Sequence, residues 1–76
     1  MAKGILSNNI RTLRFHANEM TQKDLADRVG VTRQTILAIE AAKYSPSLEL
    51  AFQIAQVFGV PLSDVFSYSP VRKAFP

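Results

Sequence analysis

The chain has no cysteine, no tryptophan, a single histidine and no long apolar run among its 76 residues. Without cysteine it can build neither a disulfide framework nor a thiolate zinc site. His16 has no neighbouring cluster of metal ligands, so a solvated or C-capping place at a helix end fits it better than a metal or catalytic role. No segment approaches the roughly 18 apolar residues of a membrane span, and the N-terminus lacks the apolar core of a signal peptide. We therefore expect a cytoplasmic protein that holds no metal or cofactor.

Arrays of residues that carry enzyme chemistry are also missing. The sequence has no Ser/His/Asp arrangement, no phosphate-binding loop and no carboxylate pair in a supporting context, which argues against an enzyme. Its net charge of +3 and pI near 9.7 suit an anionic partner, although many small basic proteins bind no nucleic acid. A hydrophobic content of 47% over 76 residues predicts one globular domain of modest stability.

Apolar residues recur at helical spacing along most of the chain, and no segment alternates with period two for long enough to predict a strand. The pattern predicts an all-α domain of five helices joined by short loops. Ser7 is a candidate cap for the first helix, after a loose start at residues 1–4. The tail, with two prolines and no periodicity, is expected to be either disordered or a strand-like arm. We place the helices at about residues 7–17, 21–30, 32–40, 47–58 and 61–66.

The stretch from Met20 to Glu40 is typical of two short helices joined by a tight turn. Thr21 and Thr32 are suitable N-caps, because their hydroxyls can accept hydrogen bonds from free amides in the first turn. Gly30 ends the first of these helices, since a residue without a Cβ enters the left-handed conformation at the lowest cost. Two isoleucines mark the inner side of the second helix, and its outer side begins with an Arg-Gln pair.

These residues resemble the lambda-repressor/Cro-type helix-turn-helix family, the XRE-like regulators. The matching segments are TQKDLADRVGVTRQTI, AIE and KYSPSLELAFQIAQVFGVPLSDVF, which lie within residues 5–66. The resemblance implies a compact five-helix lambda-repressor-like domain in which helices two and three form the helix-turn-helix. The chain is similar to short regulators that consist of little else. Residues 1–66 would then be the DNA-binding domain, and residues 67–76 a C-terminal tail that is a candidate dimer arm.

The resemblance also implies that the second helix of the motif lies in the major groove, with its first residues at the base edges. Arg33 and Gln34 occupy those positions. Their chemistry agrees, because arginine can bind guanine O6 and N7, and glutamine can be bidentate to adenine. The alternative is a solvated pair at a helix start. Leu37 and Ala38 lie one turn further on, where Leu37 could contact a thymine methyl or cover the edge of the core.

Other residues are candidates for phosphate contacts, which position a protein on DNA without reading its sequence. Gln22 heads helix two, where its amide and the free backbone N–H groups can meet a phosphate, although it could instead be a second capping residue. The further candidates, on helix one and around the reading helix, are Arg11, Thr32, Thr35, Lys43 and Tyr44.

Arg14 could contact phosphate too, but the family suggests another role. There an arginine in helix one often pairs with the glutamate near the end of the reading helix, which is Glu40 here, and the fork would hold the two helices together. The chain then departs from its relatives, which commonly have Asn-Gly where it has Ala41-Ala42. Because alanine enters a left-handed turn at a cost of roughly 1 kcal/mol, we expect either a longer helix or a reshaped loop.

A single reading helix contacts few base pairs, so proteins of this type usually bind palindromic operators as homodimers. We expect a sequence-specific regulator that binds double-stranded DNA, and a repressor because a bare domain has no obvious activation surface. The alternatives are an antitoxin that binds a toxin protein and autoregulates its operon, and a helical protein that binds nucleic acid without sequence choice. The apolar candidates for the dimer interface are Val65, Phe66, Tyr68, Val71 and Phe75.

Overall fold

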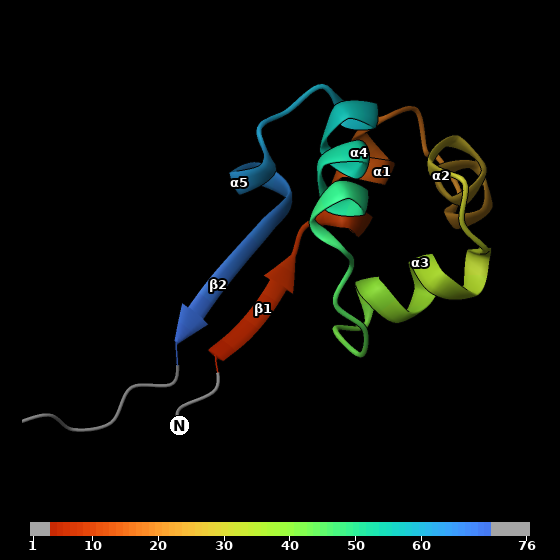
Figure 1. The fold of residues 1–76 in the computed structure, drawn as a ribbon. Coiled ribbons are helices and arrows are strands. Elements are labelled where there is room, and N and C mark those ends of the chain that lie inside the picture. Colours follow the sequence, from red (N-terminus) through yellow and green to blue (C-terminus); the bar gives the residue numbers. More distant parts are fainter. Residues whose placement is uncertain (1–3, 71–76) are drawn as a thin grey trace, which may run out of the picture.

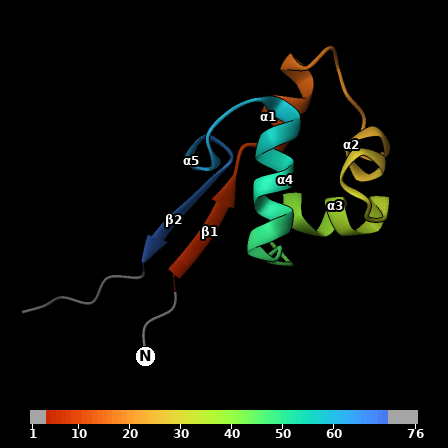
Figure 2. The same cartoon turned by 45° about the horizontal axis from the view of Figure 1, so that its top comes forward.

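The computed structural model describes residues 4–70, which form a group of five helices with a two-stranded sheet at one side (Figure 1). α4 stands between the sheet and the pair α2 and α3 in both views of Figures 1 and 2. The elements in chain order are β1 (Gly4–Asn8), α1 (Ile10–His16), α2 (Gln22–Val29), α3 (Arg33–Glu40), α4 (Leu48–Phe58), α5 (Leu62–Val65) and β2 (Phe66–Pro70).

The helices begin and end at local capping signals. The Thr21 hydroxyl accepts a hydrogen bond from the Asp24 backbone N–H at 3.0 Å, and the Asp24 carboxylate accepts one from the Thr21 N–H at 3.4 Å. This reciprocal pair is a capping box. Thr32 and Ser47 cap α3 and α4 with their hydroxyls. Gly30 ends α2 in the left-handed conformation with φ at 74°. The predicted caps at Thr21, Thr32 and Gly30 are confirmed.

The core lies between the helices and, within residues 4–70, holds no buried polar side chain. Each helix contributes one face, because side chains at positions i, i+3 and i+4 of a helix share a side. Truncation of a fully buried member to alanine should lower the free energy of unfolding by about 2–5 kcal/mol. The largest fully buried side chains are Ile10, Leu25, Ile36, Ile39, Ile54 and Val65.

The prediction of a purely helical fold was wrong, because two strands pair near the ends of the described chain. β1 and β2 run antiparallel, with Leu6 opposite Tyr68 and Ser7 opposite Ser67. The two serine hydroxyl oxygens lie 2.9 Å apart although they are 60 residues apart in sequence. Each strand has only five residues, too few for a period-two pattern to stand out. Their pairing is also set by a distant segment, which a local reading of the sequence cannot see.

Gly4, expected to belong to a loose start, lies in β1 beneath the ring of Tyr68. A Cβ atom at Gly4 would overlap the tyrosine ring, so no side chain fits there unless the ring moves. An aromatic ring over a strand glycine helps to fix the pairing register. Of the two alternatives for the tail, the strand-like arm holds for Phe66–Pro70, and β2 thus spans the expected boundary between residues 66 and 67. Residues 71–76 lie outside the described range.

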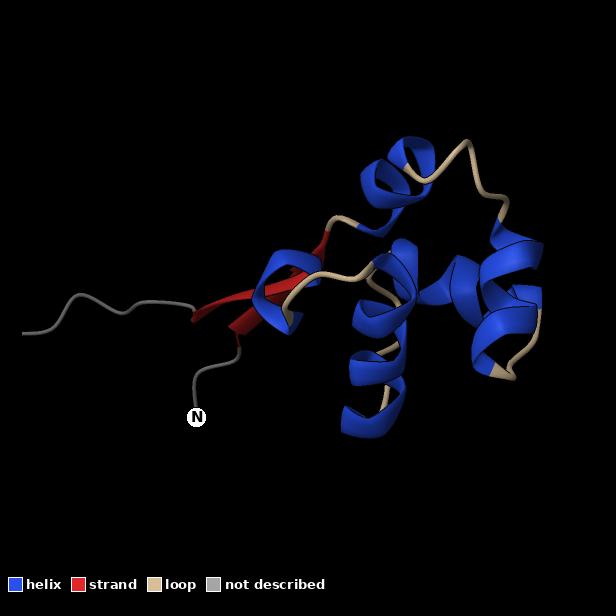
Figure 3. Ribbon diagram, turned by 90° about the horizontal axis from the view of Figure 1, so that it is seen from above, coloured by secondary structure: helices blue, strands red, loops and turns tan. Residues whose placement is uncertain are grey.

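The first and fifth helices are shorter than predicted. Ser7 does not cap helix one, because it lies in β1, and α1 begins only at Ile10. The Asn8 side-chain oxygen instead accepts a hydrogen bond from the Ile10 N–H at 3.1 Å, which starts the helix with an asparagine turn. α5 comprises four residues and lies beside the sheet, as seen from above in Figure 3.

Candidate nucleic-acid interface

α2 and α3 meet at a tight turn that Gly30 makes. The Val31 N–H donates to the Ala26 carbonyl oxygen at 3.0 Å and so closes the end of α2. Ala26 is 1% exposed, and its small side chain lets the helices approach closely. Thr32 then starts α3, with its hydroxyl accepting from the Thr35 N–H at 3.2 Å. The segment from residue 22 to residue 40 is therefore a helix-turn-helix.

α3 buries one side and presents the other to solvent. Its two isoleucines are fully buried in the core. Arg33 and Gln34, the predicted base-reading pair, are exposed at the N-terminal end of the helix. Leu37 is 44% exposed one turn further on, and Ala38 is half-buried beside it. The exposed side of α3 thus begins with two side chains that can donate hydrogen bonds to base edges.

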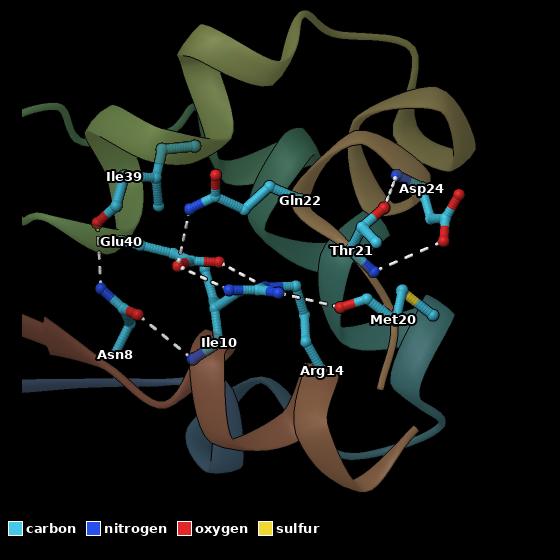
Figure 4. Close-up of polar contacts among 9 residues, drawn as sticks. All are labelled: Asn8, Ile10, Arg14, Met20, Thr21, Gln22, Asp24, Ile39 and Glu40. Atoms are coloured by element: carbon cyan, nitrogen blue, oxygen red, sulfur yellow. Dashed lines mark hydrogen bonds and ion pairs between the residues drawn. The ribbon is translucent and has the colours of Figure 1, made fainter. Parts of the chain in front are cut away.

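Arg14 and Glu40 form a bidentate ion pair between α1 and the end of α3 (Figure 4). Arg14 Nε lies 2.7 Å from Glu40 Oε2, and its Nη2 lies 3.1 Å from Oε1. Arg14 Nη1 also donates to the Met20 carbonyl oxygen at 2.8 Å. Gln22 Nε2 donates to Glu40 Oε1 at 3.2 Å. The network therefore ties α1, the loop before α2, the first residue of α2 and the last residue of α3 together.

This network lies largely out of water, since the Arg14 and Glu40 side chains are 15% and 10% exposed. A charge-assisted pair of this geometry is strong, and removal of one partner leaves the other charge without compensation. Arg14 is committed to this network rather than to solvent. Gln22 also takes part in it, although an amide has a second N–H and an oxygen for other partners.

The predicted phosphate contacts surround α3 without forming a single cluster. Arg11 and Gln22 line a hollow beside Leu37, and Gln22 also lines a second hollow with Lys23 and Arg33. Lys23 was not among the predicted site residues. Its ammonium group donates to the Asp27 carboxylate at 3.0 Å, a hydrogen bond that raises the pKa of Lys23. Lys23 is thus a cation at neutral pH near the start of α2.

The remaining phosphate candidates lie at the two ends of α3. Thr32 and Thr35 lie at its start, with their hydroxyl oxygens 3.1 Å apart. Lys43 and Tyr44 follow its C-terminal end and are exposed, Tyr44 by 51%. These positions flank the exposed side of α3.

The turn after α3 contains the two alanines that replace the Asn-Gly of the relatives. α3 ends at Glu40, and Ala42 adopts the left-handed conformation with φ at 59°. The Lys43 N–H donates to the Ala38 carbonyl at 2.9 Å, and the Ala42 N–H donates to the Ile39 carbonyl at 3.0 Å. These two bonds define a Schellman motif. The helix neither runs on nor gives way to a reshaped loop, so both expected alternatives were wrong.

Asn8 was not among the predicted site residues, although it connects two distant parts of the chain. Its Nδ2 donates to the Ile39 carbonyl oxygen at 3.0 Å, while its Oδ1 accepts from the Ile10 N–H. An asparagine just before a helix does suggest a local turn. Its second partner, Ile39, lies 31 residues further along the chain, and no pattern in the sequence predicts a contact over that separation.

The residues predicted for a dimer interface fall into three groups. Val65 is fully buried in the core of its own chain, so its assignment to the surface was wrong. Phe66 is half-buried and Tyr68 is 60% exposed. Val71 and Phe75 lie outside the described residues. The structure adds an apolar hollow over α4, α5 and the sheet, whose apolar lining residues are Leu6, Phe52, Leu62, Phe66 and Tyr68.

Within residues 4–70 no helix is long and apolar enough to cross a membrane. The same residues contain no group of three or more His, Cys, Asp or Glu side chains placed to hold a metal ion.

Comparison with protein families gives a match to the helix-turn-helix model over residues 10–65. The chain therefore belongs to this family of DNA-binding transcriptional regulators, in its XRE-type branch. A protein of Methanocaldococcus jannaschii named as an HTH-type transcriptional regulator is 52% identical over 63 residues, which cover 83% of this chain and 94% of the relative. The HTH-type regulator YgzD of Bacillus subtilis is 43% identical over 61 residues, or 80% of this chain and 91% of YgzD.

Two more distant similarities extend this picture. The cryptic phage CTXphi transcriptional repressor RstR of Vibrio cholerae is 35% identical over 65 residues, which cover 86% of this chain and 58% of RstR. Among solved structures, a protein of Bacteroides fragilis described as DNA-binding superimposes with a TM-score of 0.71 at 22% identity, covering 82% of this chain and 98% of that one. At that identity the superposition shows a shared fold.

Proposed function

We propose that the protein is a transcriptional repressor that binds a palindromic operator as a homodimer, with α3 in the major groove of each half-site. The observation that carries this proposal is the exposed Arg33-Gln34 pair at the start of a helix whose other side is buried. A recognition helix contacts bases with its N-terminal residues, and these two side chains match the donor and acceptor patterns of guanine and adenine. Leu37 and Ala38 are the next residues on that surface.

The phosphate contacts proposed for this surface come from both ends of the motif. Gln22 and the free amides of α2 would meet one strand of the duplex, since a helix N-terminus favours an anion. Lys43 and Tyr44 would contact phosphate beyond the C-terminal end of α3. Thr32 and Thr35 would contact phosphate near the start of α3, and Arg11 would do so from α1. Such contacts set the register of α3 in the groove without adding sequence preference.

Homodimer formation is supported by an unpartnered apolar surface away from α3. Phe52 on α4 is 53% exposed and lines the same hollow as Leu6 and Tyr68 from the sheet. A two-stranded sheet is only marginally stable in water unless its apolar face is covered. A second copy related by a two-fold axis would cover both sheets with the same contacts. It would also present two α3 helices about one turn of DNA apart, roughly 34 Å.

The proposed action as a repressor is supported by the named function of one relative and by the elements of the described domain. Within residues 4–70 the helix-turn-helix, its core and the sheet account for every helix and strand. A bound domain of this kind acts most simply by occupying its operator. RstR is named as a repressor. The relatives described above are named as transcriptional regulators, and nothing in the fold favours the antitoxin alternative.

A binding titration tests this proposal. Selection from a random duplex pool gives candidate operators, and affinities for a selected and a random duplex are then measured at several salt concentrations. We expect the selected duplex to be palindromic and to bind at least about 10³-fold more tightly. Equal affinities with the same salt dependence would refute sequence-specific recognition. Sedimentation of the full chain, and of a chain ending at Pro70, would show whether the protein is a dimer and whether residues 71–76 contribute.

A further inference from the structure

Asn8 connects the sheet to the proposed reading helix. It is the last residue of β1, and its Nδ2 donates to the Ile39 carbonyl oxygen near the end of α3 at 3.0 Å. Figure 4 shows its amide between the start of α1 and the end of α3. Both of its hydrogen bonds are partly buried. In the part of the chain that the structure describes, no other side-chain hydrogen bond joins a strand to α3.

The neighbouring Asn9 makes a similar bond to a different element. Its Nδ2 donates to the Asp64 carbonyl oxygen in α5 at 3.2 Å, and its backbone N–H donates to the Val65 carbonyl at 2.8 Å. Two adjacent asparagines therefore hold the junction, Asn8 toward α3 and Asn9 toward α5. The chain thus offers an internal comparison between two side chains of equal size and chemistry.

The Ile39 carbonyl is among the last four of α3, which lack partners within the helix. It accepts from Ala42 in the Schellman turn and from Asn8, so both of its lone pairs are used. The Asn8 bond therefore fixes the C-terminal end of α3 relative to β1. The sheet projects from the helices (Figures 1 and 2), so a small rotation at this junction displaces its far end considerably.

We propose that Asn8 is a positioning residue for DNA binding, which fixes the angle between the sheet and α3 and so the spacing of the two reading helices in the dimer. This inference rests on the proposed function, in which α3 reads DNA and the sheet contributes to the dimer surface. Moving one half-site by a single base pair shifts it by about 3.4 Å and rotates it by about 35°. A dimer with a fixed angle discriminates against that change, whereas a dimer with a loose junction adapts to it.

The experiment compares Asn8→Asp with Asn9→Asp. Each variant keeps the size of the side chain, adds one negative charge and turns an acceptor oxygen toward a main-chain carbonyl. Asn8→Asp also retains the oxygen that accepts from the Ile10 N–H. Asn8 lines the hollow beside Arg11 and Gln22, whereas Asn9 does not, so Asn8→Asp should lower overall DNA affinity more than Asn9→Asp. The measurement is therefore the preference between spacings, which a uniform loss of affinity leaves unchanged and which depends on whether the bond to α3 is kept.

Affinity is measured for the selected operator and for versions with half-sites one base pair closer or further apart. We expect the wild type and Asn9→Asp to prefer one spacing. In Asn8→Asp this preference should fall by about tenfold, the equivalent of about 1.4 kcal/mol, which is of the order of one lost hydrogen bond, because the Ile39 carbonyl keeps its bond from Ala42. An unchanged spacing preference in Asn8→Asp would overturn the inference.

Residual dipolar couplings of the free protein give a second measurement that needs no DNA. In the wild type and Asn9→Asp, the amides of the sheet and the helices should fit one alignment tensor, whereas in Asn8→Asp the sheet should need its own. A single tensor in Asn8→Asp would overturn the inference. If the wild type itself bound every spacing equally, the dimeric proposal would fail, and the couplings would decide the role of Asn8. Should Asn8→Asp not fold, Asn8→Ser keeps an acceptor for Ile10 but cannot reach Ile39.

Discussion

Replacement of Ala42 by glycine should stabilise the protein, because the native backbone already has the conformation that glycine prefers. Ala42 has φ at 59° and is held there by the Schellman bonds at the end of α3. A Cβ in the left-handed region costs about 1–2 kcal/mol, and the substitution removes that strain. Against this, glycine gives the unfolded chain more freedom, which lowers stability by about 0.4–1 kcal/mol. The net gain in the free energy of unfolding is about 1 kcal/mol.

The neighbouring alanine provides the control. Ala41 has φ at −81°, where alanine is unstrained, so Ala41→Gly has no strain to relieve. It should lower the free energy of unfolding by about 0.4–1 kcal/mol. Two substitutions of the same kind, one residue apart, are thus expected to act in opposite directions.

Thermal and denaturant unfolding followed by far-ultraviolet circular dichroism measures both effects, with protein concentration held constant because dimer formation would raise the apparent stability. For a domain of this size, about 1 kcal/mol shifts the Tm by roughly 4–8 °C, upward for Ala42→Gly and downward for Ala41→Gly. If both variants lost stability equally, the left-handed strain at Ala42 would be absent and the reasoning refuted.

Three further changes test other parts of the structure. Glu40→Ala leaves Arg14 without its partner in a largely buried site, so the free energy of unfolding should fall by about 3 kcal/mol in denaturant titrations. Arg33→Ala should weaken operator binding by about 1–3 kcal/mol and relax preference at one base pair, whereas Lys43→Ala should weaken all duplexes alike and flatten the salt dependence by about one unit. Gly4→Ala should displace the Tyr68 ring and broaden the amide signals of the sheet in NMR spectra, while those of the helices remain.

Each of these predictions has a matched comparison. Asp27→Asn removes the exposed partner of Lys23 and should change the free energy of unfolding by less than about 0.5 kcal/mol. If Glu40→Ala lowered the free energy of unfolding by no more than Asp27→Asn does, burial of the Arg14–Glu40 pair would have no consequence for stability. If Arg33→Ala weakened all duplexes alike, Arg33 would be a phosphate contact rather than a base contact. An unaltered sheet in Gly4→Ala would show that the tyrosine ring has room to move.

The helix-turn-helix could be predicted because its signals are local. The caps at Thr21 and Thr32, the turn at Gly30 and the spacing of the isoleucines each involve residues within a few positions of one another. Because each of these interactions joins near neighbours in the sequence, a short window contains the information. The exposure of Arg33 and Gln34 follows from the same periodicity.

The remaining features depend on contacts between distant segments. β1 is a strand because β2 lies beside it, and Asn8 bonds to α3 because the two are brought together by the core. Ala42 shows a different limit. Its own preference disfavours the left-handed conformation, but two backbone hydrogen bonds and the path of the following loop outweigh a strain of about 1–2 kcal/mol.

The pairing of β1 with β2 also sets an order of events during synthesis. Residues 4–8 leave the ribosome first among the described residues, yet their partner strand is made only after every helix has been made. The buried core of the helices lies within residues 10–65, all of them made before β2, whereas the sheet must wait to close a loop of 60 residues. The surface proposed for the dimer is therefore completed last. During synthesis the helix-turn-helix would therefore be complete before the dimer surface is. Only a fully synthesised chain could then form a dimer on the operator.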